Sequence, residues 1–70
     1  MEYTIIIEYA GGKYTAYAPD IPGCVATGAT VDEARRSMQE ALVLHLAMLR
    51  EMGETFPTAH SQAAIVQIAC

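Results

Sequence analysis

The sequence predicts an α+β fold: a two-layer sandwich in which one long helix covers one face of a four-stranded mixed sheet. One observation behind this is a series of short stretches rich in β-branched and aromatic residues, separated by turns that contain glycine or proline. The other is a single stretch, beginning near Thr30, in which apolar residues recur at helical spacing. The expected order is strand, strand, strand, helix, strand, in one domain over residues 1–70.

A tight hairpin is expected at the start of the chain. Residues 2–9 (EYTIIIEY) are β-branched and aromatic, which is typical of a strand. Gly11 and Gly12 can adopt the positive φ angles of a two-residue hairpin turn, and residues 13–18 (KYTAYA) then return antiparallel.

The register of this hairpin predicts two different sheet faces. On one face Ile7 lies opposite Ala16, and a bulky residue beside a small one leaves room for a helix to lie close. The other face places Ile6 beside Tyr17 and is too apolar to be purely solvated. We therefore expect this second face to meet another chain.

Residues 19–23 (PDIPG) are expected to interrupt the sheet. Neither Pro19 nor Pro22 can donate to a strand ladder, and Gly23 permits a backbone turn that most residues resist. Residues 24–28 (CVATG) then read as a short third strand.

A capping box predicts where the helix begins. The Thr30 hydroxyl can accept a hydrogen bond from the Glu33 amide while the Glu33 side chain reaches back, and Gly53 is a natural stop. At 100° per residue one arc of this helix faces the sheet. Its members are Val31, Ala34, Met38, Ala41, Leu42, His45, Met48, Leu49 and Met52. In this arc His45 is expected to be a neutral, structural residue.

A last strand is expected at the C-terminal end. Residues 54–61 (ETFPTAHS) form a polar connector, and residues 62–70 (QAAIVQIAC) are apolar and β-branched. A right-handed crossover would set this strand parallel to the first one, which gives the spatial order 3-2-1-4.

Composition argues against several classes of partner. The net charge is −4, with only four lysines and arginines, so we expect no direct binding to nucleic acid. An acidic chain can instead complement a basic protein. The first residues hold no basic cluster, and the longest strongly apolar run is about half a membrane span, so we expect a cytoplasmic protein that does not enter a membrane.

Candidate catalytic and metal-binding residues have ordinary explanations. Glu8, Asp20 and Asp32 could form the carboxylate cluster of a metal-dependent nuclease, but they also suit an exposed strand position, a turn and the first turn of a helix. A metal site would need four scattered residues to converge. These are Cys24, His45, His60 and Cys70. We expect no metal or cofactor, and both cysteines reduced.

Excess apolar surface predicts self-association. Of the 70 residues 53% are hydrophobic, and one helix can cover only one face of the sheet. We therefore expect a homodimer or a higher even-numbered oligomer. The face of Ile6 and Tyr17 is the favoured joining surface. The margin of the helix, with Val43, Leu44 and Leu46, and the edge strand near Cys24 are the alternatives.

Two stretches resemble the small N-terminal domain of the HicB family of antitoxins: YTAYAPDIPGCVATGATVDEA and EALVLHLAMLREMGETFP, within a match from about Tyr3 to Pro57. The resemblance implies a partly degenerate ribonuclease-H-like fold that binds and inhibits a small, basic, HicA-like ribonuclease toxin. The antitoxin itself is not an enzyme. An oligomeric HicB-like domain of unknown ligand is the alternative.

In that family the PDIPGC stretch is chiefly a structural turn, so Pro22 and Gly23 would have structural roles. The side chains of Asp20, Ile21 and Cys24 would help to form the toxin-binding surface. Full-length members usually continue into a ribbon-helix-helix or helix-turn-helix segment. We find no such segment in this sequence and expect a stand-alone domain without direct DNA binding.

Overall fold

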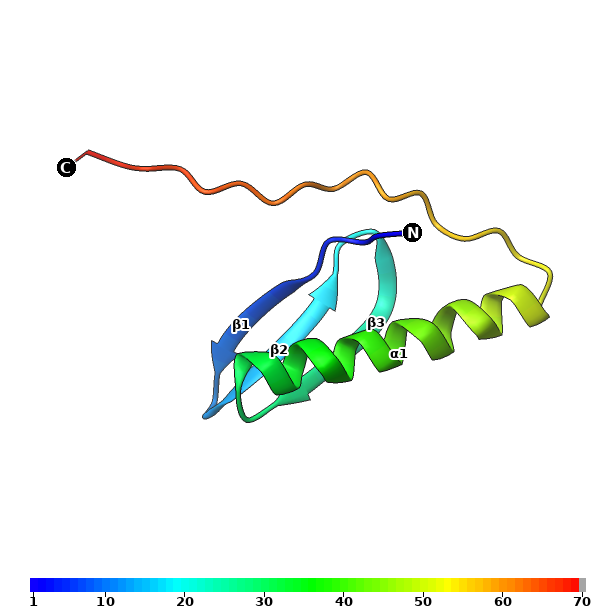
Figure 1. The fold of residues 1–70 in the computed structure, drawn as a ribbon, viewed down its shortest axis with the longest axis horizontal. Helices are drawn as coiled ribbons and strands as arrows, with labels where there is room; N and C mark the ends of the chain where they lie inside the picture. Colours follow the sequence, from blue (N-terminus) through cyan, green and yellow to red (C-terminus); the bar gives the residue numbers. More distant parts are fainter. Residues whose placement is uncertain (70) are drawn as a thin grey trace.

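The computed structural model describes residues 1–69 and folds them into three strands followed by one helix (Figure 1). The strands are β1 (Ile6–Ala10), β2 (Lys13–Ala18) and β3 (Ile21–Gly28), antiparallel in the order β1-β2-β3. Helix α1 (Val31–Glu51) lies across one face of this sheet. The α+β class and the two-layer arrangement are therefore confirmed.

The hairpin between β1 and β2 has the predicted turn and register. Gly11 and Gly12 occupy the turn with φ angles of 64° and 82°, a region that glycine enters without steric cost. The paired residues are Ile6 with Tyr17, Ile7 with Ala16, Glu8 with Thr15, Tyr9 with Tyr14, and Ala10 with Lys13. A two-residue turn thus sets which side chains share a face.

The first strand begins later than predicted, at Ile6. The ladder between β1 and β2 begins with the pair of Ile6 and Tyr17, and residues 1–5 form no strand. Two of them bond instead to the C-terminal part of the chain through their hydroxyl groups, which donate to backbone carbonyls. Tyr3 donates to the Pro57 carbonyl at 2.7 Å and Thr4 to the Ser61 carbonyl at 2.9 Å.

The third strand begins earlier than predicted, at Ile21, so the expected interruption over residues 19–23 is wrong in part. Ile21 already pairs with Ala18, and the ladder then shifts register over residues 22–24 before it continues. Gly23 takes a φ of 85° in this bulge. A proline is tolerated there because β3 is an edge strand, where a missing N–H costs no ladder bond.

The start of α1 follows the predicted cap with one difference. The Thr30 hydroxyl accepts from the Glu33 amide at 3.1 Å, as expected. The Glu33 carboxylate accepts from the amide of Ala29 at 3.0 Å, one residue before the cap. The Glu33 amide, which the helix leaves without a partner, is satisfied by Thr30, and the Ala29 amide before the helix is satisfied by Glu33.

The helix ends at the predicted glycine. Gly53 has a φ of 74°, and its amide donates to the Arg50 carbonyl at 3.1 Å. The next amide, of Glu54, donates to the Leu49 carbonyl at 2.9 Å. These two bonds form a Schellman motif, which ends the helix and turns the chain back.

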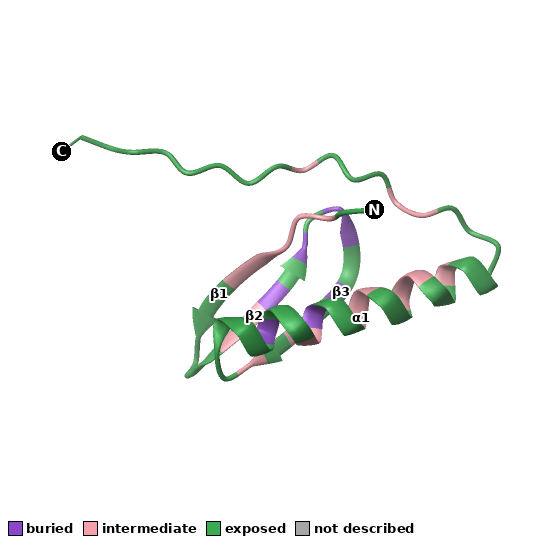
Figure 2. Cartoon of the chain, viewed as in Figure 1, coloured by how far each residue is buried: buried purple, intermediate pink, exposed green. Residues whose placement is uncertain are grey.

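The core lies between the sheet and the first half of α1 (Figure 2). Its buried residues are Ala16, Ala18, Ile21, Cys24, Ala34 and Met38. The last residue of β3, Gly28, lies close to the first turn of α1, where a Cβ atom would be 2.5 Å from the Ala34 amide nitrogen. The predicted room for a helix over the small strand residues is confirmed, because Ala16 is buried in the same core cluster as Ala34 and Met38 of α1.

The apolar arc of α1 is less buried than predicted. Val31, Met48 and Met52 are exposed, and His45 is half-buried. A helix of 21 residues is about 31 Å long, whereas a strand of five to eight residues spans roughly 17–26 Å. The last turns of α1 therefore extend past the end of the sheet (Figure 1).

The expected fourth strand is not formed, so the order 3-2-1-4 is wrong for residues 1–69. Residues 62–69 run clear of the sheet without a strand partner, and Cys70 lies outside the described residues. This makes the molecule long, 50 × 26 × 17 Å, with a radius of gyration of 13.8 Å. A compact chain of this length would have a radius of about 11 Å.

Candidate protein-binding surfaces

The sheet face opposite α1 carries a row of apolar side chains. Ile6 pairs with Tyr17, and Tyr17 pairs with Val25, so the row crosses β1, β2 and β3. Tyr17 is 37% exposed and Val25 is 58% exposed, while Ile6 is half-buried. We call these three residues the outer row. An aromatic residue between two β-branched ones offers apolar contact area to another protein.

Polar residues lie next to the outer row on the same face. Glu8 pairs with Thr15 and Thr15 with Thr27, which puts this second row two positions along each strand. Glu8 is exposed, so the face combines an apolar centre with a carboxylate at its β1 edge. This combination suits a partner with an apolar patch and a nearby positive charge.

A second apolar surface is a groove of about 410 Å³ between the N-terminal end of the chain and α1. The groove exists because α1 packs mainly on β3 and only lightly on β1. Its lining is mostly apolar: Met1, Tyr3, Ile5, Leu42, Val43 and Leu46, with Arg35 and Gln39 at one side. We call this the β1 groove.

Three of the residues expected to contact a partner are buried. Ile21 is 1% exposed, Cys24 is 6% exposed and Asp20 is 8% exposed. Burial also raises the pKa of the Cys24 thiol, which leaves little of the reactive thiolate form. Of the sequence-derived contact residues, Ile6 and Tyr17 remain at the surface, and the other three belong to the packing of the body.

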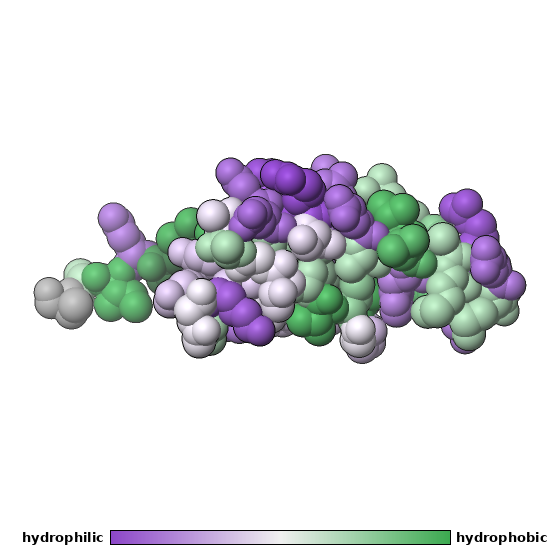
Figure 3. Space-filling view, turned by 90° about the horizontal axis from the view of Figure 1, so that it is seen from below, coloured by the Kyte–Doolittle hydropathy of each residue, from purple (hydrophilic) through white to green (hydrophobic). Residues whose placement is uncertain are grey.

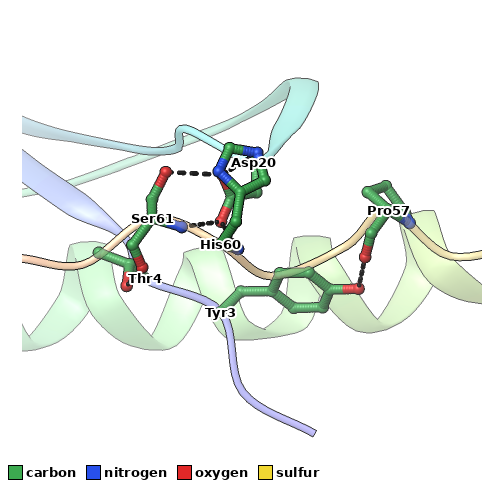
Figure 4. Close-up of polar contacts among 6 residues, drawn as sticks. All are labelled: Tyr3, Thr4, Asp20, Pro57, His60 and Ser61. Carbon is green, nitrogen blue, oxygen red and sulfur yellow. Dashed lines mark hydrogen bonds and ion pairs between the residues drawn. The ribbon is translucent and has the colours of Figure 1, made fainter.

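Asp20 holds the connector after α1 against the sheet (Figure 4). One carboxylate oxygen accepts from the amides of His60 and Ser61, at 3.0 and 2.9 Å. The other accepts from the Ser61 hydroxyl at 2.6 Å and lies 3.2 Å from the His60 Nε2 atom. We call this cluster the Asp20 anchor.

The hydrogen bonds of the anchor lower the pKa of Asp20. The Ser61 hydroxyl makes the largest contribution and the Ser61 amide the next, and both favour the charged form. The three residue types match those of a hydrolase triad, but the Ser61 hydroxyl donates to Asp20 and not to His60. His60 therefore does not accept from this serine as the histidine of such a triad does, and the bonds of the cluster tie residues 60 and 61 to Asp20.

The structure does not bring the candidate metal ligands together. Glu8 lies on the outer face of β1, Asp32 bonds Arg35 at 2.9 Å in the first turn of α1, and Asp20 belongs to the anchor. Among residues 1–69, no group of three histidine, cysteine or acidic side chains is placed to hold a metal ion. The Cys70 part of the proposed metal set lies outside the described residues.

Sequence reasoning missed the partners of Asp20. His60 and Ser61 lie in a polar stretch that looked like a solvated loop, 40 and 41 residues away from the aspartate. No local pattern indicates a contact at that separation. Across residues 1–69 the structure contains no helix long and apolar enough to cross a membrane.

Comparison with known proteins identifies the family. A family model described as the HicB-like antitoxin of bacterial toxin–antitoxin systems matches residues 3–69. The crystal structure of the antitoxin HicB of Burkholderia pseudomallei is similar with a TM-score of 0.77 and 36% identity, over 89% of this chain and 48% of that one. The crystal structure of the N-terminal domain of that antitoxin has a TM-score of 0.75 and 35% identity, over 87% and 73%.

One curated relative is the "Uncharacterized 14.9 kDa protein in rep-hol intergenic region" of Haemophilus phage HP1. It is 35% identical over 60 residues, which are 86% of this chain and 45% of the relative. The chain thus spans about half the length of that protein and of the first HicB structure. Because the family model covers residues 3–69 and the fold agrees with that of a HicB N-terminal domain, this chain belongs to the HicB-like antitoxin family of bacterial toxin–antitoxin systems.

Proposed function

We propose that this chain acts as the inhibitory module of a toxin–antitoxin pair, binding a small basic ribonuclease by direct protein contact. Its membership of the HicB-like antitoxin family carries the proposal. The chemistry of the chain supports it, because eight acidic residues against four basic ones give a net charge of −4. Opposite net charges raise the rate at which two proteins meet and favour the correct partner.

The outer row is the surface we propose for the toxin. Helix α1 occupies the opposite face of the sheet, so the outer row is the sheet face left open in this chain. Tyr17 at its centre can provide a rigid aromatic anchor, and Glu8 beside it can pair with a lysine or arginine of the toxin. Inhibition would follow from covering the toxin and requires no chemistry by this chain.

The family is generally non-enzymatic, and the best-placed carboxylate here agrees with that role. Both oxygens of Asp20 already bond to His60 and Ser61, so a substrate or metal ion would have to displace the anchor.

We further infer that the chain works as a homodimer or a higher even-numbered oligomer. Exposed apolar residues outside the outer row, such as Ile65 and Ile68, support this inference.

Co-expression with the product of the adjacent reading frame tests the proposal. We expect that frame to encode a small basic protein that arrests growth alone, and we expect this chain to restore growth and to co-purify with it. Val25→Asp should abolish both effects, because it puts a charge in the outer row at a position that is 58% exposed.

Leu44→Asp is the matched control, since Leu44 is 72% exposed on α1, away from the outer row. It should keep both rescue and co-purification, and circular dichroism should show that both variants are folded. Failure of rescue and of co-purification by the unmodified chain would remove the antitoxin proposal. Equal behaviour of the two variants would instead remove the outer row as the contact surface.

A further inference from the structure

The C-terminal residues 62–69 (QAAIVQIA) form an uncharged, apolar segment that contacts almost nothing in this chain. Ile65 is 101% exposed, Val66 78% and Ile68 80%. Figure 3 shows the apolar end of this segment projecting past the body of the molecule. β-Branched residues in an extended backbone with open N–H and C=O groups are the features of a strand that lacks its neighbour. We call residues 62–69 the free segment.

The body has an open place of matching shape beside β1. In the sheet order β1-β2-β3, β1 is an edge, so one side of its backbone is free to pair. The β1 groove lies at the N-terminal end of that edge, between the residues that precede β1 and helix α1, and is lined mainly by apolar side chains, including Ile5 and Leu42. A strand added along β1 would therefore pair with the open backbone groups of β1 and would at the same time cover the groove.

The residue pattern of the free segment suits both pairing with β1 and covering the β1 groove. In a strand, alternate side chains point to opposite faces, so Val66 and Ile68 would share one face and Ile65 would take the other. With the first pair over the β1 groove, Ile65 would continue the outer row beside Ile6. Eight extended residues span about 26 Å, enough for the roughly 17 Å of the five-residue β1.

The free segment begins close to its own β1 but does not pair with it in this structure. The Asp20 anchor and the Thr4 hydroxyl hold Ser61 from two sides. From there the segment runs clear of the sheet (Figure 1). Residues 58–69 contain no glycine or proline that would turn the chain back. Its lack of charge also lets two acidic copies approach through it without added repulsion.

We propose that the free segment of one copy pairs as a strand along β1 of a second copy, and that the exchange is reciprocal. Each copy then donates one segment and receives one, which closes a two-fold dimer. The sheet of each copy gains a fourth strand, and that strand comes from its partner. This inference does not depend on toxin binding, because it concerns only two copies of the same chain.

Mass measurement in solution gives the first test. Light scattering of the full chain at micromolar concentration should give 15 kDa, twice the 7.5 kDa of one chain. Val66→Lys should give 7.5 kDa, because it puts a charge where the segment would face the groove. Gln67→Lys adds the same charge at the next position, on the opposite face of the segment, and should leave the dimer intact. Because both positions are exposed in the single chain, neither substitution should unfold the body.

Isotope-filtered nuclear magnetic resonance gives the second test. In a sample mixed from labelled and unlabelled copies, methyl contacts between Val66 or Ile68 and Ile5 or Leu42 should appear in the spectrum that records only contacts between chains. Such contacts found only within one chain would show that the segment folds back on its own β1, and would overturn the proposal. A wild-type monomer, or a dimer that Val66→Lys leaves unchanged, would overturn it too.

Discussion

Replacing Gly28 by alanine should push α1 off the sheet. The added Cβ would lie 2.5 Å from the Ala34 amide nitrogen and 2.8 Å from the Glu33 carbonyl carbon, whereas ordinary contacts begin near 3.4 Å. The backbone must therefore yield by about 0.9 Å, because both atoms belong to the helix backbone and no side chain can rotate away. Overpacking of this kind costs about 1–3 kcal/mol.

That cost is large for a domain of 70 residues, whose total free energy of unfolding is expected to be about 4–10 kcal/mol. Urea unfolding followed by circular dichroism at one fixed protein concentration measures the change. With an m value of about 1 kcal/mol/M, the midpoint for Gly28→Ala should fall by about 1–3 M.

Thr27→Ala is the control for this measurement. It makes a substitution to alanine at the neighbouring position of β3, on the exposed face that does not meet α1. It should change the free energy of unfolding by less than about 1 kcal/mol. If Gly28→Ala and Thr27→Ala unfold at the same urea concentration, a Cβ atom at position 28 does not strain the contact with α1, and the reasoning is refuted.

Two further outcomes are expected. Thr30→Ala should lower the free energy of unfolding by about 1 kcal/mol in the same urea assay, because the Glu33 amide loses its acceptor. Thr30→Ser keeps a hydroxyl and should retain most of that stability. Equal losses in the two variants would argue against the cap. Because the pKa of Asp20 is lowered in the folded state, its stabilising effect should be complete above about pH 4 and should disappear as the pH falls through the lowered value. Amide hydrogen exchange at His60 and Ser61 should accelerate as the pH falls over that range. In Asp20→Asn the same acceleration should be present at neutral pH. Unchanged exchange in that variant would contradict the anchor.

Local sequence signals predicted the body of the fold well. The pair Gly11–Gly12 determined the hairpin register and so placed Ile6 beside Tyr17, and Thr30 with Gly53 marked both ends of α1. Each of these signals works through bonds between residues a few positions apart. The family resemblance added the class of protein, which none of these local signals contains.

The errors concern places where the outcome depends on distant partners. Ile21 and Cys24 were expected at a contact surface, but both are buried in the core cluster with residues of α1. Asp20 looked like an ordinary turn residue because its partners lie some 40 residues further along the chain. Residues 62–69 have the composition of a strand, yet composition alone cannot say which edge they will join.

The distances along the chain between contacting residues also suggest an order of folding. Each strand packs on the next, and α1 packs mainly on β3, which precedes it directly, so the body consists of local contacts that form quickly. The connector's hydrogen bonds join residues 40 to 57 positions apart. We expect these bonds to form last and to open first. A newly made chain would therefore fold its three strands and α1 before its C-terminal residues pair with any sheet edge. Two chains folded to that stage could still exchange their C-terminal residues.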